Sequence, residues 1–142
     1  MRYLKEFLFT LGGFIGSMIV KFIGGWSKDF ETLLWFMVFD YIIGVIAAGV
    51  FHVSPKTKNG RLESSAGLKG LCKKLFMLFM VSIGYHLDIL LCIDYVRTTI
   101  IIGLILNELL SIIESWGLIG LPLPNILIEA VEILKKKTER GK

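Results

Sequence analysis

Three carboxylates stand inside long apolar stretches of this 142-residue chain, where ionisable side chains are rare. Asp40, Asp88 and Glu108 each lie in a run long enough to cross a bilayer. A charged side chain in the middle of a membrane helix costs roughly 2.5 to 3.5 kcal/mol on insertion scales. Three such groups cost about 7 to 10 kcal/mol, so we expect them to be protonated, paired across helices or facing water.

Small or polar residues accompany each carboxylate one helical turn away, a spacing that favours contact with another helix. The candidate contact or pore residues are therefore Asp40, Gly44, Ala48, Gly84, Asp88, Gly103, Asn107, Glu108 and Ser111. The same pattern is equally consistent with hydrogen-bonding groups that only hold helices together.

The composition indicates an integral membrane protein with one small domain, residues 1–142. Of all residues, 54% are hydrophobic and 20% charged, and the mean hydropathy is +0.70. A soluble core of this size cannot bury so many long apolar runs. The net charge of +4 is modest, and the basic residues lie between the apolar runs. They are better explained as cytoplasmic anchors than as a nucleic-acid site.

The apolar runs predict an all-α fold with four transmembrane helices. The predicted spans lie near residues 7–25, 33–51, 75–93 and 98–115. A basic loop, 52–74, separates the second and third spans. After Pro124 the segment NILIEAVEILKKK predicts an amphipathic helix in a cytoplasmic tail, residues 122–142.

Basic side chains predict which ends face the cytoplasm. With both termini inside, thirteen Lys and Arg residues lie on the cytoplasmic side and two on the outside. The candidate membrane-surface lysines are Lys69, Lys73, Lys74, Lys135, Lys136 and Lys137. If the first run lay in the interface instead of spanning, the N-terminus would move outside and the other spans would keep their orientation.

The first run is similar to a secretory signal peptide, but it is longer than the usual apolar core and no small-residue cleavage site follows. An uncleaved span is the better prediction. Gly12 and Gly16 form a GxxxG surface for helix packing, although glycine is frequent in membrane helices generally. In a hairpin of the first two runs, Lys21 and Asp40 lie at similar depth, which leads to the hypothesis of an ion pair.

Nothing in the sequence predicts a catalytic, cofactor or metal site. Cys72 and Cys92 stand at opposite ends of the third run, too far apart for a disulfide, and neither has metal-ligand spacing. His86 and Asp88 point about 200° apart on a helix. No nucleophile with a base and no nucleotide loop is present, so we expect a protein that is not an enzyme.

The order of motifs resembles the bacteriophage holin family, which also includes the clostridial toxin-secretion holins. The matching stretch covers roughly Leu33 to Lys137, and its most specific part is NELLSIIESWGLIGLPLP. The matching residues are Phe39, Asp40, Gly44, Ser64, Ser65, Gly67, Lys69, Lys73, Asp88, Asn107, Glu108, Ser111, Glu114, Gly117, Gly120, Pro122 and Pro124.

The resemblance implies a phage or prophage product that oligomerises in the bacterial cytoplasmic membrane and opens lesions at a set time. Its partners would be its own copies and the phospholipid bilayer, with an endolysin or a toxin as passenger. A small ion or proton channel, or a transporter subunit, is the main rival. A structural adaptor whose basic tail recruits a cytoplasmic partner is the second.

Overall fold

The computed structural model describes residues 1–140, which contain five α-helices and no strand. The helices are α1 (Arg2–Phe22), α2 (Lys28–Ile46), α3 (Ser64–Leu91), α4 (Val96–Ile119) and α5 (Asn125–Arg140). A π-helical turn, η1 (Ala47–Phe51), continues α2. The predicted all-α fold is confirmed; residues 141–142 of the predicted tail lie outside the described residues.

Four helices are long and apolar enough to cross a membrane: α1, α2 with η1, α3 and α4. The boundary of α3 differs most from the prediction, because this helix begins at Ser64 and takes in residues 64–74 of the expected loop. That stretch holds no proline, and its leucines and lysines are good helix formers. With 28 residues α3 is about 42 Å long, so it exceeds a hydrocarbon core of about 30 Å by roughly two turns.

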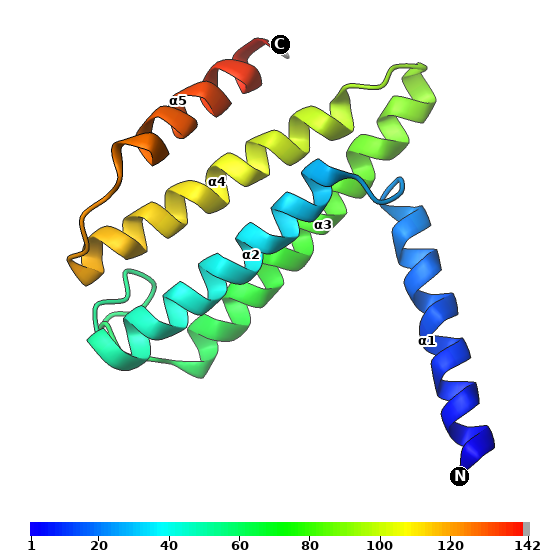
Figure 1. Ribbon diagram of the computed structural model, residues 1–142, viewed down its shortest axis with the longest axis horizontal. Helices are drawn as coiled ribbons and strands as arrows, with labels where there is room; N and C mark the ends of the chain where they lie inside the picture. The colour runs from blue at the N-terminus through cyan, green and yellow to red at the C-terminus, as the bar shows by residue number, and fades with distance from the viewer. Residues whose placement is uncertain (141–142) are drawn as a thin grey trace.

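The central helix of the bundle is α4, which packs against α2, α3 and α5. Figure 1 shows α2 and α4 running in one direction and α3 in the other. We call the end with the two links, residues 23–27 and 92–95, the link end, and the opposite end with residues 52–63 the loop end. The apolar core consists of Ile23, Phe30, Leu33, Met37, Met77, Val81, Ile101 and Ile105.

A glycine allows α3 to approach α4 closely at the link end. A Cβ on Gly84 would lie 2.7 Å from Ile100 Cδ1 and 3.0 Å from the Cα of Arg97. We expect Gly84→Ala to lower the free energy of unfolding by about 1–3 kcal/mol, because the two backbones must separate. Thermal unfolding in detergent measures this loss. Gly70→Ala is the control, since nothing lies within 4 Å of a Cβ there; equal unfolding temperatures for both variants would contradict the prediction.

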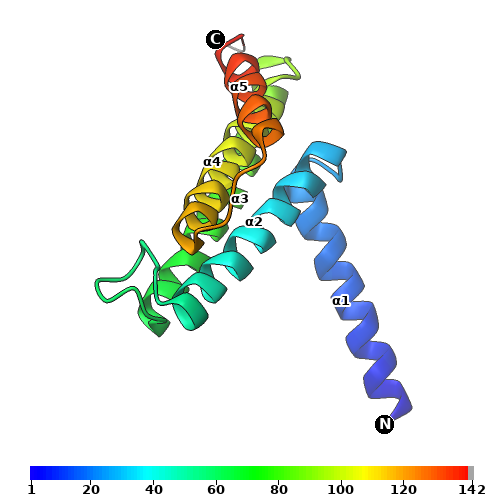
Figure 2. The same cartoon turned by 60° about the vertical axis from the view of Figure 1, so that its left-hand side comes forward.

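The first helix stands apart from the bundle in both views (Figures 1 and 2). None of the residues of α1 is buried, and a Cβ on Gly12 or Gly16 would meet nothing within 4 Å. The GxxxG surface therefore has no partner within the described chain, and its packing against another copy stays a prediction. Only the end of α1 is attached: Ser82 Oγ donates a hydrogen bond of 2.9 Å to the carbonyl of Phe22.

The last helix, α5, runs back alongside α4 toward the link end (Figures 1 and 2). Val131 is buried, and Leu134 packs against the apolar core. The predicted amphipathic helix is confirmed, and part of its surface is shielded from solvent. The reason is that its apolar side finds a partner surface on α4.

Candidate functional site

A lysine on α3 joins two buried carboxylates from two other helices. Lys74 Nζ donates a hydrogen bond of 2.9 Å to Asp40 Oδ2 on α2 and another to Glu108 Oε2 on α4. Lys56 Nζ lies 3.4 Å from the same Asp40 oxygen. Asp40 is 4% exposed and Glu108 2%, whereas the side chains of Lys74 and Lys56 are 14% and 46% exposed. We call these four side chains the charge network.

The two carboxylates meet because parallel helices carry them to the same depth. Asp40 lies twelve residues after Lys28, the first residue of α2, and Glu108 lies twelve after Val96, the first of α4. Both helices begin at the link end. Twelve residues rise about 18 Å, which is near the middle of a hydrocarbon core of about 30 Å. Lys74 reaches them from the antiparallel α3 on its flexible four-carbon stem.

The formal charges of the network cancel, because two ammonium groups face two carboxylates. A buried ion is tolerated when it is paired and hydrogen-bonded, and it is costly when either condition fails. Pairing across helices is therefore how this conformation accommodates Asp40 and Glu108. The same contacts tie α2, α3, α4 and the loop between α2 and α3 into one unit.

The loop between α2 and α3 folds back on itself to deliver Lys56. The backbone N–H of Ser54 donates to the Gly60 carbonyl at 3.0 Å, and the N–H of Lys56 donates to Ser54 Oγ at 3.2 Å. Gly60 has φ +68°, and a Cβ there would lie 2.1 Å from the His52 carbonyl oxygen. Only glycine fits at this position.

A cavity of about 60 Å³ separates this loop from α2 and α3, and Asp40, Gly44 and Ala48 line it. Two polar atoms from its lining are buried without a hydrogen-bond partner among the described residues, Asp40 Oδ1 and Thr57 Oγ1. Ser111 of α4 lies beside Asp40 but does not bond to Oδ1. The lining is mostly apolar but carries these two polar atoms, and the cavity is large enough for a water molecule that would bond to them. The predicted stripe of Asp40, Gly44 and Ala48 thus faces the chain's own loop.

The third predicted carboxylate, Asp88, caps a helix. Its two oxygens accept hydrogen bonds of 2.9 Å from the backbone N–H groups of Val96 and Arg97. These are the first residues of α4, whose N–H groups have no partner within the helix and whose dipole favours a negative charge. Asp88 and Gly84 therefore have a role inside the chain, and their contact with another copy stays a prediction.

Sequence reasoning missed Arg97, which joins the two links. Its guanidinium donates to the carbonyls of Ile23 and Gly25 at 2.8 and 2.9 Å and to the Ser27 hydroxyl at 3.2 Å. It also lies 5.9 Å from the centre of the Phe30 ring. The available signal was an arginine beside a link predicted to lie outside, against the charge bias, with a second link that contains adjacent glycines.

We expect Arg97→Lys to lower the free energy of unfolding by about 1–3 kcal/mol, since an ammonium group cannot reproduce the fork of three hydrogen bonds. The measurement is thermal unfolding in detergent. Lys28→Gln serves as control, because this exposed cation at the first position of α2 forms no ion pair among the described residues. A variant as stable as the control would show that the fork is dispensable.

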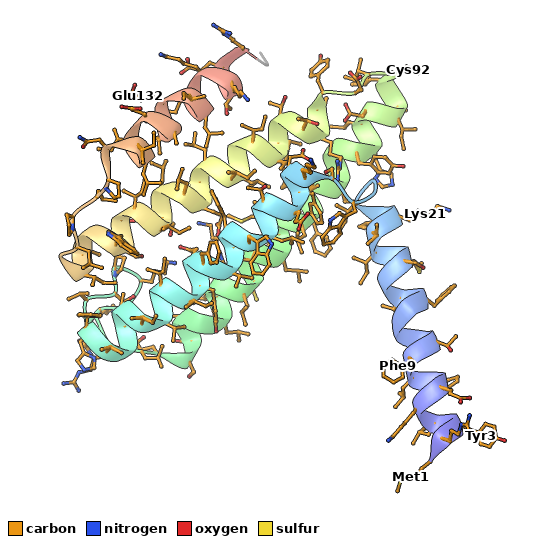
Figure 3. All side chains as sticks on the ribbon, in the orientation of Figure 1. Met1, Tyr3, Phe9, Lys21, Cys92 and Glu132 are labelled. Atoms are coloured by element: carbon orange, nitrogen blue, oxygen red, sulfur yellow. The ribbon has the colours of Figure 1, made fainter. Side chains whose placement is uncertain are left out.

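Two predictions about lysines are wrong. Lys21 is exposed and points away from the bundle (Figure 3), because α1 diverges from α2 instead of packing along it. It does not pair with Asp40. Lys74 was predicted at the membrane surface and is instead largely buried in the charge network. The other candidate surface lysines are exposed: Lys69, Lys73, Lys135, Lys136 and Lys137.

The candidate contact residues predicted on α4 lie on two faces of the helix. Glu108 points inward, whereas Asn107 is exposed and remains outside the charge network. Gly103, one turn before Asn107, has nothing within 4 Å of a Cβ. Asn107 and Gly103 therefore lie on an open surface of α4, where contact with another copy stays a prediction.

The charge network holds three helices together, because Lys74 on α3 bonds to carboxylates on α2 and α4. Within residues 1–140, no group of three or more His, Cys, Asp or Glu side chains is arranged to hold a metal ion. Both cysteines are free thiols and exposed.

These features define a multi-pass helical membrane protein whose bundle neutralises its own buried charges. The chain belongs to the bacteriophage holin family, whose model matches residues 17–136. An uncharacterised protein of Halalkalibacterium halodurans is 36% identical over 118 residues, 79% of this chain and 82% of the relative. One from Clostridium perfringens is 33% identical over 87% of each chain, and one from Listeria monocytogenes 32% identical over 76% of this chain and 72% of the relative. No solved structure matches.

Proposed function

We propose that this holin-like protein assembles in the bacterial cytoplasmic membrane and opens lesions at a set time. An endolysin or a toxin crosses through them as a passenger. The partners of the chain are its own copies and the phospholipid bilayer, and neither an enzyme site nor a nucleic acid is involved. Family membership and four helices able to span a membrane support this proposal.

The observation that carries the proposal is the surface left without a partner. The chain pairs Asp40 and Glu108 internally, yet it leaves Asn107 exposed in the middle of α4 beside the open surface at Gly103. Polar and small residues on the outside of a membrane helix favour contact with another helix. Together with α1, which has no buried residue, this surface favours assembly of several copies.

Controlled expression in a bacterium tests the proposal. We expect abrupt loss of viability on induction, and lysis of the culture only when an endolysin is supplied in the cytoplasm. A selective channel would leave large proteins inside the cell, and an adaptor would leave the membrane intact. Either result would exclude the holin function.

The charge network favours a second candidate, a small ion or proton channel or a transporter subunit. Ionisable side chains grouped at the depth of a membrane span are typical of such proteins. Purified protein in vesicles separates the two functions. A holin releases a trapped protein-sized dextran, whereas a channel dissipates an ion gradient and retains the dextran.

The proposed orientation places the N-terminus and the loop end in the cytoplasm. The two natural cysteines report on it, since Cys72 lies in the loop-end part of α3 and Cys92 follows its last residue at the link end. We expect a membrane-impermeant maleimide added to intact cells before lysis to label Cys92 and spare Cys72. The variants Cys72→Ser and Cys92→Ser assign the label. Labelling of Cys72 alone would reverse the orientation.

A further inference from the structure

The side chains of α5 are sorted by polarity around the helix. On the side toward α4 lie the less exposed residues Leu127, Ala130, Val131, Leu134 and Thr138. On the opposite side lies a stripe of exposed polar residues, which we call the polar stripe: Asn125, Glu129, Glu132, Lys136 and Arg140. Figure 3 shows Glu132 on the side that faces away from α4.

The polar stripe lies at the depth of the membrane span. With 16 residues α5 is about 24 Å long, and it runs antiparallel to α4 from the loop end toward the link end. Since α4 is one of the candidate spans, most of α5 lies beside hydrocarbon if the surroundings are lipid. Charged side chains at this depth require water or a charged partner.

We infer that α5 forms part of the wall of the open lesion, with its apolar side on α4 and its polar stripe toward the water of the lumen. This inference rests on the proposed function, because a lumen exists only between assembled copies. Ile126 and Ile133 are exposed on one flank of α5, where a neighbouring copy provides apolar contact.

Before assembly no lumen exists, and the same helix belongs at the cytoplasmic surface. There its apolar side enters the interface, and Lys135, Lys136 and Lys137 face anionic headgroups. The link of residues 120–124 joins α4 to α5 outside helical structure. On assembly α5 moves about this link from the cytoplasmic surface, where the charge bias predicts the tail, to its position beside α4.

Distances between spin labels test the position of α5 in the assembled state. The full-length protein is reconstituted in vesicles of phosphatidylethanolamine and phosphatidylglycerol that release trapped dextran. Lys137→Cys is paired with native Cys92 in a Cys72→Ser chain, and with native Cys72 in a Cys92→Ser chain. We expect the distance from residue 137 to Cys92 to be the shorter one. The reverse order would overturn the inference, because α5 would then lie on the cytoplasmic surface.

Water accessibility tests what the polar stripe faces. A label at Glu132→Cys is expected to collide freely with a water-soluble nickel complex, whereas a label at Phe14→Cys on the exposed apolar surface of α1 is expected to collide with oxygen dissolved in lipid. A label at position 132 that the nickel complex does not reach would overturn the inference.

Dextran release tests whether the lesion needs the charges of the polar stripe. We expect the double variant Glu132→Leu with Lys136→Leu to lose release, since it removes the charges from the middle of the polar stripe. The control, Lys58→Leu with Asp94→Leu, makes the same change in two exposed residues outside α5 and keeps release. Equal release by both would overturn the inference. If the unaltered protein neither releases dextran nor lyses cells, the proposed function itself fails; release with α5 at the surface refutes only its place in the wall.

Discussion

Lys74→Met is expected to destabilise the folded bundle by about 3–5 kcal/mol, the usual effect of removing one partner from a buried ion pair. Methionine fills similar space without a charge, so the loss reports the missing ammonium group and not a cavity. Glu108 would then be buried without its cation, while Asp40 would keep only the partly exposed Lys56. The measurement is reversible unfolding in mixed micelles, followed by helical circular dichroism.

Two further variants make the Lys74→Met prediction specific. Lys69→Met changes an exposed lysine on the same helix and is expected to have little effect, within about 0.5 kcal/mol. Lys74→Met combined with Glu108→Gln removes both charges, and we expect it to recover most of the loss, since neutral replacements of a buried pair are often harmless. Equal effects of Lys74→Met and Lys69→Met would show that the charge network does not stabilise the bundle.

The sequence predicts the helices well because their determinants are local. Apolar runs long enough to span a bilayer identify α1 to α4, and a 3.6-residue pattern identifies α5. The beginning of α3 was predicted wrongly, at residue 75 instead of Ser64, since Gly67 and Gly70 among lysines are also typical of loops. Whether residues 64–74 form a loop or a helix depends on tertiary contacts at this end of the bundle, which the sequence does not display.

The partners of the buried carboxylates could not be predicted from periodicity. Lys21 was the only cation inside the expected spans, so it was the natural partner for Asp40, but the choice assumed that the first two runs form a hairpin. Lys74 was counted with the loop, outside the membrane. Its long side chain instead enters the bundle from within α3, a reach that spacing along one helix does not reveal.

The two adjacent polar residues on α4 illustrate a second limit. Asn107 and Glu108 are about 100° apart around the helix, and both flanks of α4 are rich in Ile and Leu. Hydrophobicity therefore does not decide which of the two faces inward. Packing decides it, because α2 and α4 run parallel and bring Glu108 opposite Asp40 at equal depth.

Glu108→Gln is expected to bring forward the onset of lysis. The change replaces an ion pair by a hydrogen bond from the Lys74 ammonium to a neutral amide, which weakens the contact between α3 and α4 by about 1–2 kcal/mol while Lys74 keeps Asp40. If separation of these helices limits lesion formation, each 1.4 kcal/mol corresponds to about tenfold in its rate. Asp40→Asn weakens the same network and is expected to shift the onset in the same direction. Optical density after induction, with an endolysin present, measures the onset.

The control for this timing experiment is Glu114→Gln, an exposed carboxylate on the same helix that forms no ion pair among the described residues. We expect its onset to match that of the unaltered protein, and changes of Lys135 to Lys137 to glutamine to have a milder effect than Glu108→Gln, since the side chains stay polar. Immunoblots of membranes confirm equal accumulation. Unchanged onset in both Glu108→Gln and Asp40→Asn would remove the charge network from the timing of lysis, and it would leave the network as a purely structural element of the bundle.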